Sequence, residues 1–187
     1  MRAADLCGPP RGSARVGPLR GLQGEAALKR WLHLSARFFD VVSARPLDPS
    51  ETQEVRDLLE SGEAALFFAQ TAADQRHGLE GARAVGGSRR LIRTALLHDV
   101  GKRHARLGPL GRVVATVLAV LRIPLSGRMA QYDHHGAIGA DELSDLGEPD
   151  RMLEYVRFHH TSMPAGYPAD EWSSLQGADS ARIVDRR

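Results

Sequence analysis

The stretch that decides the fold is Leu96-Leu97-His98-Asp99-Val100-Gly101-Lys102, in which a histidine and an aspartate directly follow an apolar run. Upstream, Ile92 and Ala95 stand at helical spacing, and continuing their stripe by three or four residues reaches Asp99. The sequence therefore predicts a carboxylate on the core-facing side of a helix, at its C-terminal end. Desolvation and the negative end of the helix dipole both disfavour a charged carboxylate there. A bound divalent cation would offset both effects, because its positive charge stabilises the carboxylate.

Further side chains of metal-ligating type are spread along the chain. Adjacent helical residues diverge by about 100°, so neighbouring histidines serve two metals about 3.5–4 Å apart more readily than one. An aspartate can bridge two cations with its two oxygens, which a histidine cannot do. We therefore expect a buried metal cluster assembled from several helices. Besides His98 and Asp99, its candidates are His77, the His134-His135 pair, the His159-His160 pair and Asp179.

The expected donors are imidazoles and carboxylates, because the single cysteine, Cys7, lies in an irregular N-terminal stretch. A donor set without thiolate favours Fe or Mn over a structural zinc ion. One cysteine also excludes a disulfide framework and fits a reducing, cytoplasmic setting.

Apolar residues recur at three-to-four-residue intervals through most of the chain, and no alternating strand pattern is present, so we predict an all-α fold. Residues 1–22 are rich in Gly, Pro and Arg and are predicted to be a disordered tail. Residues 23–187 are predicted to form one domain. Ser50 with Gln53 is the expected cap of its second helix. The predicted helices cover 25–42, 50–59, 63–85, 89–98, 110–121, 135–146, 149–159 and 171–184.

The composition sets further limits. The chain has 187 residues, of which 42% are hydrophobic, which suffices for one domain with a core. A formal net charge of +2 is too small to indicate nucleic-acid binding. No run of about 18 apolar residues exists, so no transmembrane segment is predicted. The oligomeric state is left open.

The order of the candidate ligands resembles that of the HD-domain superfamily of metal-dependent phosphohydrolases. The stretch His98-Asp99-Val100-Gly101-Lys102 is similar to that family's signature, and a double histidine followed by Gly166-Tyr167-Pro168 is similar to its HD-GYP branch. The resemblance covers about 63–185. It implies an all-helical HD-type bundle with a central metal site that hydrolyses a small phosphorylated substrate, a nucleotide, with metal-activated water.

The resemblance also assigns roles to single residues. The pattern His-x-x-x-Gly favours His135 over His134 as a ligand. Lys102 matches the family's lysine near the scissile phosphate, although a lysine at a helix end also compensates the helix dipole. Two divalent ions are implied. The first would be held by His77, His98, Asp99 and Asp179, with Asp99 bridging to a second held by His135, His159 and His160.

Two alternatives remain open at this stage. A mononuclear HD nucleotide phosphatase would use the first ligand group alone. A non-catalytic HD regulatory domain would bind a nucleotide or a partner without turnover. Residues 161–165 differ from the acidic and basic pair usual in the HD-GYP branch, so the sequence does not fix the substrate.

Overall fold

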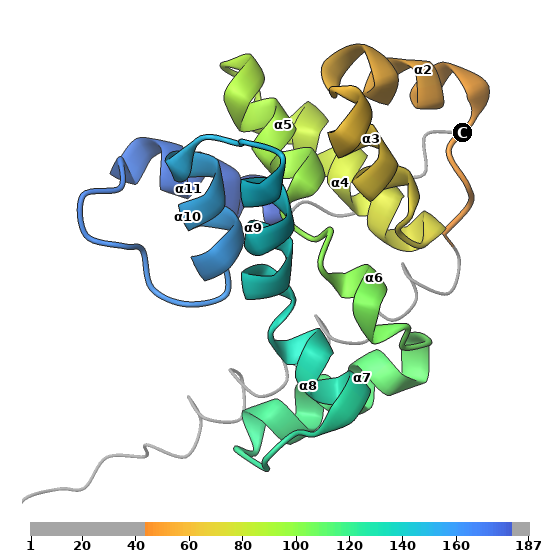
Figure 1. Cartoon of the computed structure of the whole chain (residues 1–187), viewed down its shortest axis with the longest axis vertical. Coiled ribbons are helices and arrows are strands. Elements are labelled where there is room, and N and C mark those ends of the chain that lie inside the picture. Colours follow the sequence, from red (N-terminus) through yellow and green to blue (C-terminus); the bar gives the residue numbers. More distant parts are fainter. Residues whose placement is uncertain (1–43, 181–187) are drawn as a thin grey trace, which may run out of the picture.

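The computed structural model describes residues 44–180, and every regular element in that range is a helix (Figure 1). The predicted all-α class is therefore confirmed for these residues. The predicted tail over 1–22, the helix over 25–42 and the end of the helix over 171–184 lie outside them. The helices are α2 (Pro49–Leu58), α3 (Ser61–Phe68), α4 (Ala72–Val85), α5 (Arg89–Leu97), α6 (Lys102–Ala105), α7 (Pro109–Val120), α8 (Gly127–Asp133), α9 (His135–Asp145), α10 (Asp150–Phe158) and α11 (Ala169–Asp179).

The first described helix begins earlier than predicted. The side chain of Asp48 accepts a hydrogen bond from the Glu51 amide (2.9 Å), and the Glu51 carboxylate accepts one from the Asp48 amide (3.0 Å). This reciprocal pair satisfies two free amides at the start of α2. The predicted cap formed by Ser50 and Gln53 is therefore wrong by two residues.

The single long helix predicted over 63–85 is also wrong, because the chain breaks between α3 and α4. Thr71 caps α4 by accepting a hydrogen bond from the Asp74 amide (3.4 Å), so a new helix starts there. Residues 63–77 contain no Gly or Pro that would indicate this break. The helices α6 and α8 were not predicted, since four and seven residues are too few to show a periodic apolar pattern.

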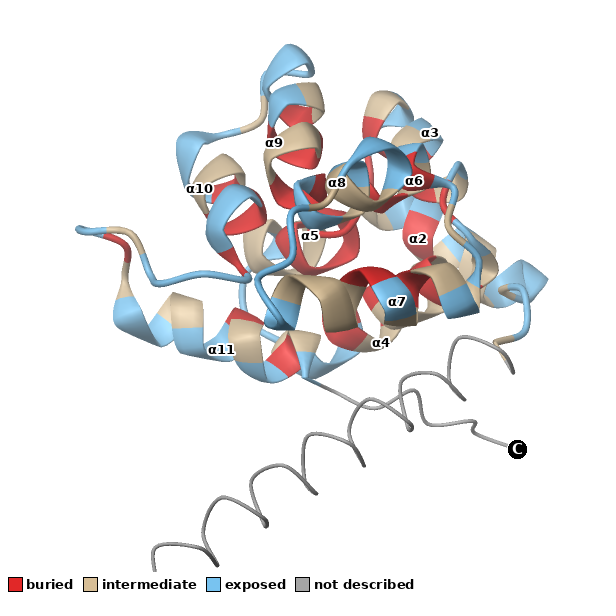
Figure 2. Ribbon diagram, turned by 90° about the horizontal axis from the view of Figure 1, so that it is seen from below, coloured by how far each residue is buried: buried red, intermediate tan, exposed pale blue. Residues whose placement is uncertain are grey.

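The C-terminal half of α5 occupies the centre of the bundle. Every residue from 94 to 101 is buried, and α5 contacts α2, α3, α4, α10 and α11 (Figure 2). Burial of the apolar side chains around it holds the surrounding helices in place. The main members of this core are Val55, Phe67, Leu79, Leu96, Leu97, Val100, Leu143, Met152, Val156 and Leu175.

The helices α6, α7 and α8 extend from one side of this bundle (Figure 1). α7 packs mainly against α8, which in turn packs against α6. A buried ion pair ties the group to the bundle, since the Arg112 guanidinium donates to both carboxylate oxygens of Asp74 on α4 (2.6 and 2.7 Å). None of the helices described is both long and apolar enough to cross a bilayer.

Gly101 allows two backbone segments to touch at the turn between α5 and α6. A Cβ atom at this position would lie 2.0 Å from the carbonyl oxygen of His135 and 2.8 Å from the amide nitrogen of Gly139. Only a residue without a side chain permits this approach. The contact brings the start of α9 against the turn that carries Asp99.

We predict that Gly101→Ala destabilises the protein by about 2 kcal/mol or more, because overpacking against a fixed backbone typically costs about 1–3 kcal/mol. Gly108→Ala is the matched control, since no atom lies within 4 Å of its added Cβ and its φ of −68° suits any residue. That control should change stability by less than about 0.5 kcal/mol. Urea unfolding measures both. Equal stability of the two variants would contradict the close approach.

Candidate metal centre

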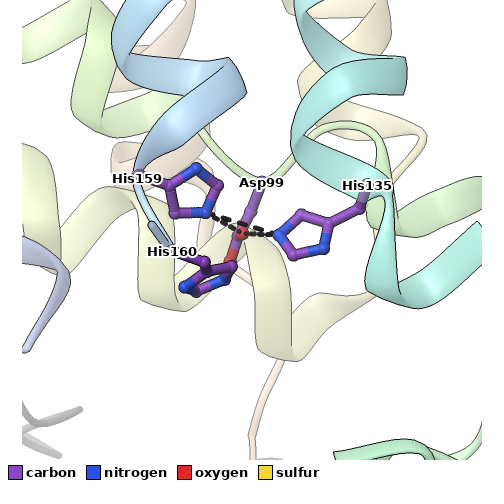
Figure 3. Close-up of side chains that lie close together, drawn as sticks. All are labelled: Asp99, His135, His159 and His160. Atoms are coloured by element: carbon purple, nitrogen blue, oxygen red, sulfur yellow. Dashed lines mark hydrogen bonds and ion pairs between the residues drawn. The ribbon is translucent and has the colours of Figure 1, made fainter. Parts of the chain in front are cut away.

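Most of the candidate ligands come from different parts of the helical bundle and converge at one place. Figure 3 shows four of them, Asp99, His135, His159 and His160. His77 lies within α4, and Asp179 is the last residue of α11. His98 and Asp99 follow α5, His135 begins α9, and His159 and His160 follow α10. Two groups have donor atoms within 4.8 Å of one another: Asp99, His135, His159 and His160, and His77, His98 and Asp99.

Asp99 belongs to both groups, and each of its oxygens faces a different set of rings. On one side, Oδ1 lies 3.2 Å from His135 Nε2 and 3.5 Å from His159 Nε2. On the other side, Oδ2 lies 3.4 Å from His98 Nε2 and 3.9 Å from His77 Nε2. The carboxylate thus stands between two ligand groups.

Asp179 joins the group on the Oδ2 side of Asp99. Its Oδ1 lies 3.0 Å from His77 Nε2 and 3.3 Å from His98 Nε2. His160 joins the group on the Oδ1 side, where its ring centroid lies 4.0 Å from that of His159 and 5.0 Å from that of His135. The residue His160 is exposed, whereas His98, Asp99, His135 and His159 are buried. His160 is therefore the member of the cluster with the greatest contact with solvent.

Three of the imidazoles are oriented by the same kind of hydrogen bond to the backbone. Nδ1 of His98, His135 and His159 donates to the carbonyl oxygen three residues earlier, at 2.9, 2.6 and 2.8 Å. A carbonyl only accepts, so Nδ1 of each ring carries a proton, and Nε2 is the nitrogen that remains to bind a metal once it is deprotonated. Since all three rings direct Nε2 towards Asp99, this arrangement presets the atoms that bind metals.

A cation fits this arrangement better than the protein atoms alone do. Two acceptors, Nε2 of His135 and Nε2 of His159, lie 3.4 Å apart. His98 Nε2 and Asp99 Oδ1 are buried and have no hydrogen-bond partner among the described residues. Leaving such polar atoms unsatisfied is costly, and a divalent cation would accept electron density from all of them. The buried His and Asp side chains could therefore hold a metal ion.

The charges of the cluster are consistent with that role. Burial would lower the pKa of His98, but the carboxylates of Asp99 and Asp179 outweigh it and raise that pKa to about 10. Burial would raise the pKa of Asp99, but His98 and Lys102 hold it well below its usual value. The pKa of Asp179 is likewise lowered against the effect of burial, by a hydrogen bond with His77 and by the nearby charge of His98. Both carboxylates are thus ionised near neutral pH.

The other histidines with shifted pKa values are neutral near pH 7. Burial lowers the pKa of His77 and that of His135, against the opposing effect of Asp179 on His77 and of Asp99 on His135. Displacement of water around the ring, together with His159, lowers the pKa of His160 to about 3. A neutral imidazole is the form that binds a metal.

Lys102 lies within the cluster. Its Nζ donates to Asp99 Oδ2 (2.5 Å) and lies 6.0 Å from the centre of the Tyr132 ring. The side chain is buried, so its charge acts in a medium of lower dielectric than water. Lys102 therefore provides a positive charge beside the face of Asp99 that His77 and His98 share.

The residues that support the rings were missed by sequence reasoning. Gln176 donates to the carbonyl oxygen of His159 (2.8 Å) and to the hydroxyl of Tyr155 (3.4 Å), whose ring is stacked on that of His159. Tyr132 supplies the carbonyl that orients His135. Nothing in their local sequence distinguishes them from ordinary helical positions. His134 points away from the cluster, with 70% of its side chain exposed.

No model of a known protein family matches this chain, and no curated protein or solved structure does either. The chemistry of the cluster is therefore inferred from the sequence pattern and the geometry of the described residues.

We predict that His135→Ala removes the part of the metal-induced stabilisation that comes from the ion beside His135 and His159, whereas its neighbour His134→Ala retains all of it. A ligand at 100 times its dissociation constant stabilises a fold by about 2.7 kcal/mol, so adding Mn²⁺ should raise the melting temperature of the wild type and of His134→Ala. Thermal unfolding with and without chelator measures the effect. Equal metal responses of the two variants would exclude His135 as a ligand.

We predict that metal binding near pH 8 releases about one proton from His98, because the raised pKa keeps this ring protonated in the metal-free protein. His77, His135 and His160 contribute no proton there, since their pKa values are lowered. The apparent affinity for the metal beside His98 should therefore rise about tenfold per pH unit from pH 7 to pH 9. Calorimetry in two buffers of different ionisation enthalpy counts the protons. A pH-independent affinity would contradict the assigned charge of His98.

Proposed function

We propose that this chain is a metal-dependent phosphohydrolase of the HD type, which hydrolyses a phosphate ester of a nucleotide. One observation carries the proposal. The candidate ligands occur in the order typical of that superfamily, and their side chains meet around one buried carboxylate. An all-α bundle is the fold that the resemblance implies, and the described residues have that class.

The proposed cofactor is a pair of divalent ions. Asp99 would hold one of them together with His77, His98 and Asp179, and the other together with His135, His159 and His160. The two ligand groups and the position of Asp99 in both of them support this number. The donors are nitrogen and oxygen only, which supports Fe or Mn. When bound, such ions supply Lewis acidity towards phosphoryl oxygens and lower the pKa of the attacking water.

The chain's own residues would hold and orient the substrate. The exposed His160 leaves an approach for a phosphate ester from solvent. Lys102 lies beside Asp99, where its ammonium group would donate to a phosphoryl oxygen and stabilise the negative charge that develops on it. Because Nδ1 of His98, His135 and His159 is already bonded to backbone, the ligand rings need little reorganisation during the reaction.

A mononuclear nucleotide phosphatase is the second candidate. His77, His98, Asp99 and Asp179 form a compact set, with the Asp179 carboxylate within 3.3 Å of both ring nitrogens. Metal analysis separates the candidates, since about two ions per chain support the dinuclear enzyme and one supports the mononuclear enzyme. A loaded chain without turnover would instead be a regulatory domain.

The test is hydrolysis by the protein loaded with Mn²⁺ or Fe²⁺, using nitrophenyl phosphate esters, nucleotides and cyclic dinucleotides. We predict that Asp99→Asn lowers kcat/KM by about 10³-fold or more, because metal ions supply several kcal/mol of transition-state stabilisation. Lys102→Ala should lower kcat by about 10²-fold with metal content unchanged. His134→Ala is the control. Full activity of Asp99→Asn would overturn the proposal.

A further inference from the structure

A basic segment without acidic residues lies in the sequence between Asp99 and His135, two members of the candidate metal centre. Residues 100–132 contain no Asp or Glu, although the whole chain has 23 of them. The same segment forms α6, α7 and α8, which extend from the bundle (Figure 1). Its basic side chains are Lys102, Arg103, Arg106, Arg112, Arg122 and Arg128, together with His104.

The segment also exposes large apolar side chains. Leu110 is 73% exposed, Leu121 62% and Val114 45%. Leu110 and Val114 lie four residues apart on one face of α7, and Leu121 directly follows the helix, seven residues after Val114. The opposite face carries the buried Arg112 and Ala115. Val120 and Ile123 are also exposed, so five of the eight exposed large hydrophobic residues of the described chain lie between residues 110 and 123.

Three arginines of the segment carry charge that the described residues do not neutralise. Arg106 ends α6, Arg122 follows α7 and Arg128 lies in α8, and all three are exposed. No ion pair joins any of them to a described acidic residue. In contrast, Arg103 is paired with Glu142, and Arg112 with Asp74. The α7 surface, defined as Leu110, Val114, Val120, Leu121 and Ile123 with these three arginines, is therefore apolar and positively charged.

We propose that the α7 surface binds the headgroup region of an anionic lipid bilayer. An amphipathic helix with exposed apolar residues and flanking cations lies in the plane of such an interface, with its apolar side chains inserted and its cations at the anionic headgroups. With 12 residues, α7 is too short to span the hydrocarbon core, so it would lie on the membrane. Charge complementarity with the exposed arginines favours this occupant over a basic or uncharged apolar partner.

The apolar stripe separates this proposal from nucleic-acid binding. A nucleic acid is bound chiefly through cations that neutralise phosphates, whereas most of the side chains that define the α7 surface are aliphatic. A bilayer uses both features at once. The inference does not depend on the proposed catalytic activity, since it requires neither a metal nor a substrate.

The test is co-sedimentation of the full chain with vesicles of phosphatidylcholine alone or with 30% phosphatidylglycerol. We expect binding to the anionic vesicles that weakens in 0.5 M salt, and little binding to the neutral ones. Leu110→Glu with Leu121→Glu should lower the partition coefficient by about tenfold or more, because two apolar anchors are lost. Arg122→Gln with Arg128→Gln, which keeps the apolar stripe, should lower it by about tenfold as well.

The matched control is Ala65→Glu with Ala84→Glu, which adds the same charge at exposed positions of α3 and α4. It should bind less tightly than wild type by a small factor only, and circular dichroism should show equal helicity for all variants. The proposal is overturned by equal losses in the control and in the Leu110 and Leu121 variant, or by the absence of anionic vesicle binding. Dimerisation or RNA binding through this surface without vesicle binding would overturn it too.

Discussion

The buried carboxylate of Asp99 constrains the rest of this molecule. It lies in the core directly after α5 with 2% of its surface exposed, where an uncompensated charge is strongly disfavoured. His98 and Lys102, close in sequence, and rings from α4, α9 and α10 surround its two oxygens. The end of α5 can remain at the centre of the bundle because those helices each bring a compensating group, so their packing and the local charge balance depend on one another.

Main-chain atoms determine how the ligands are placed. His98 and His159 sit at the C-caps of their helices and donate to the carbonyl three residues earlier, which turns Nε2 inward. Gly101 then lets the turn after α5 meet the backbone of α9, so that His135 reaches Asp99. A site built on backbone contacts of this kind has little freedom to rearrange, which suits a preorganised cluster.

The sequence predicted what periodicity can reveal and missed what depends on pairs distant in sequence. The stripe leading to Asp99 predicted a buried carboxylate, and it is buried. The all-α class followed from helical spacing alone. The break at Thr71 was missed because it depends on a single hydrogen bond within an Ala-rich run. Contacts such as Arg112 with Asp74, 38 residues apart, and Gln176 with the His159 carbonyl, 17 apart, have no local signature.

The carbonyl of Tyr132 links the outlying helices to the chemistry. Tyr132 belongs to α8, yet it holds the ring of His135 through a 2.6 Å hydrogen bond, while Lys102 begins α6 at the other end of the same segment. The position of α8 relative to the bundle therefore sets the orientation of an imidazole that faces Asp99. The outlying helices α6 and α8 thus serve as a structural support for the groups around Asp99.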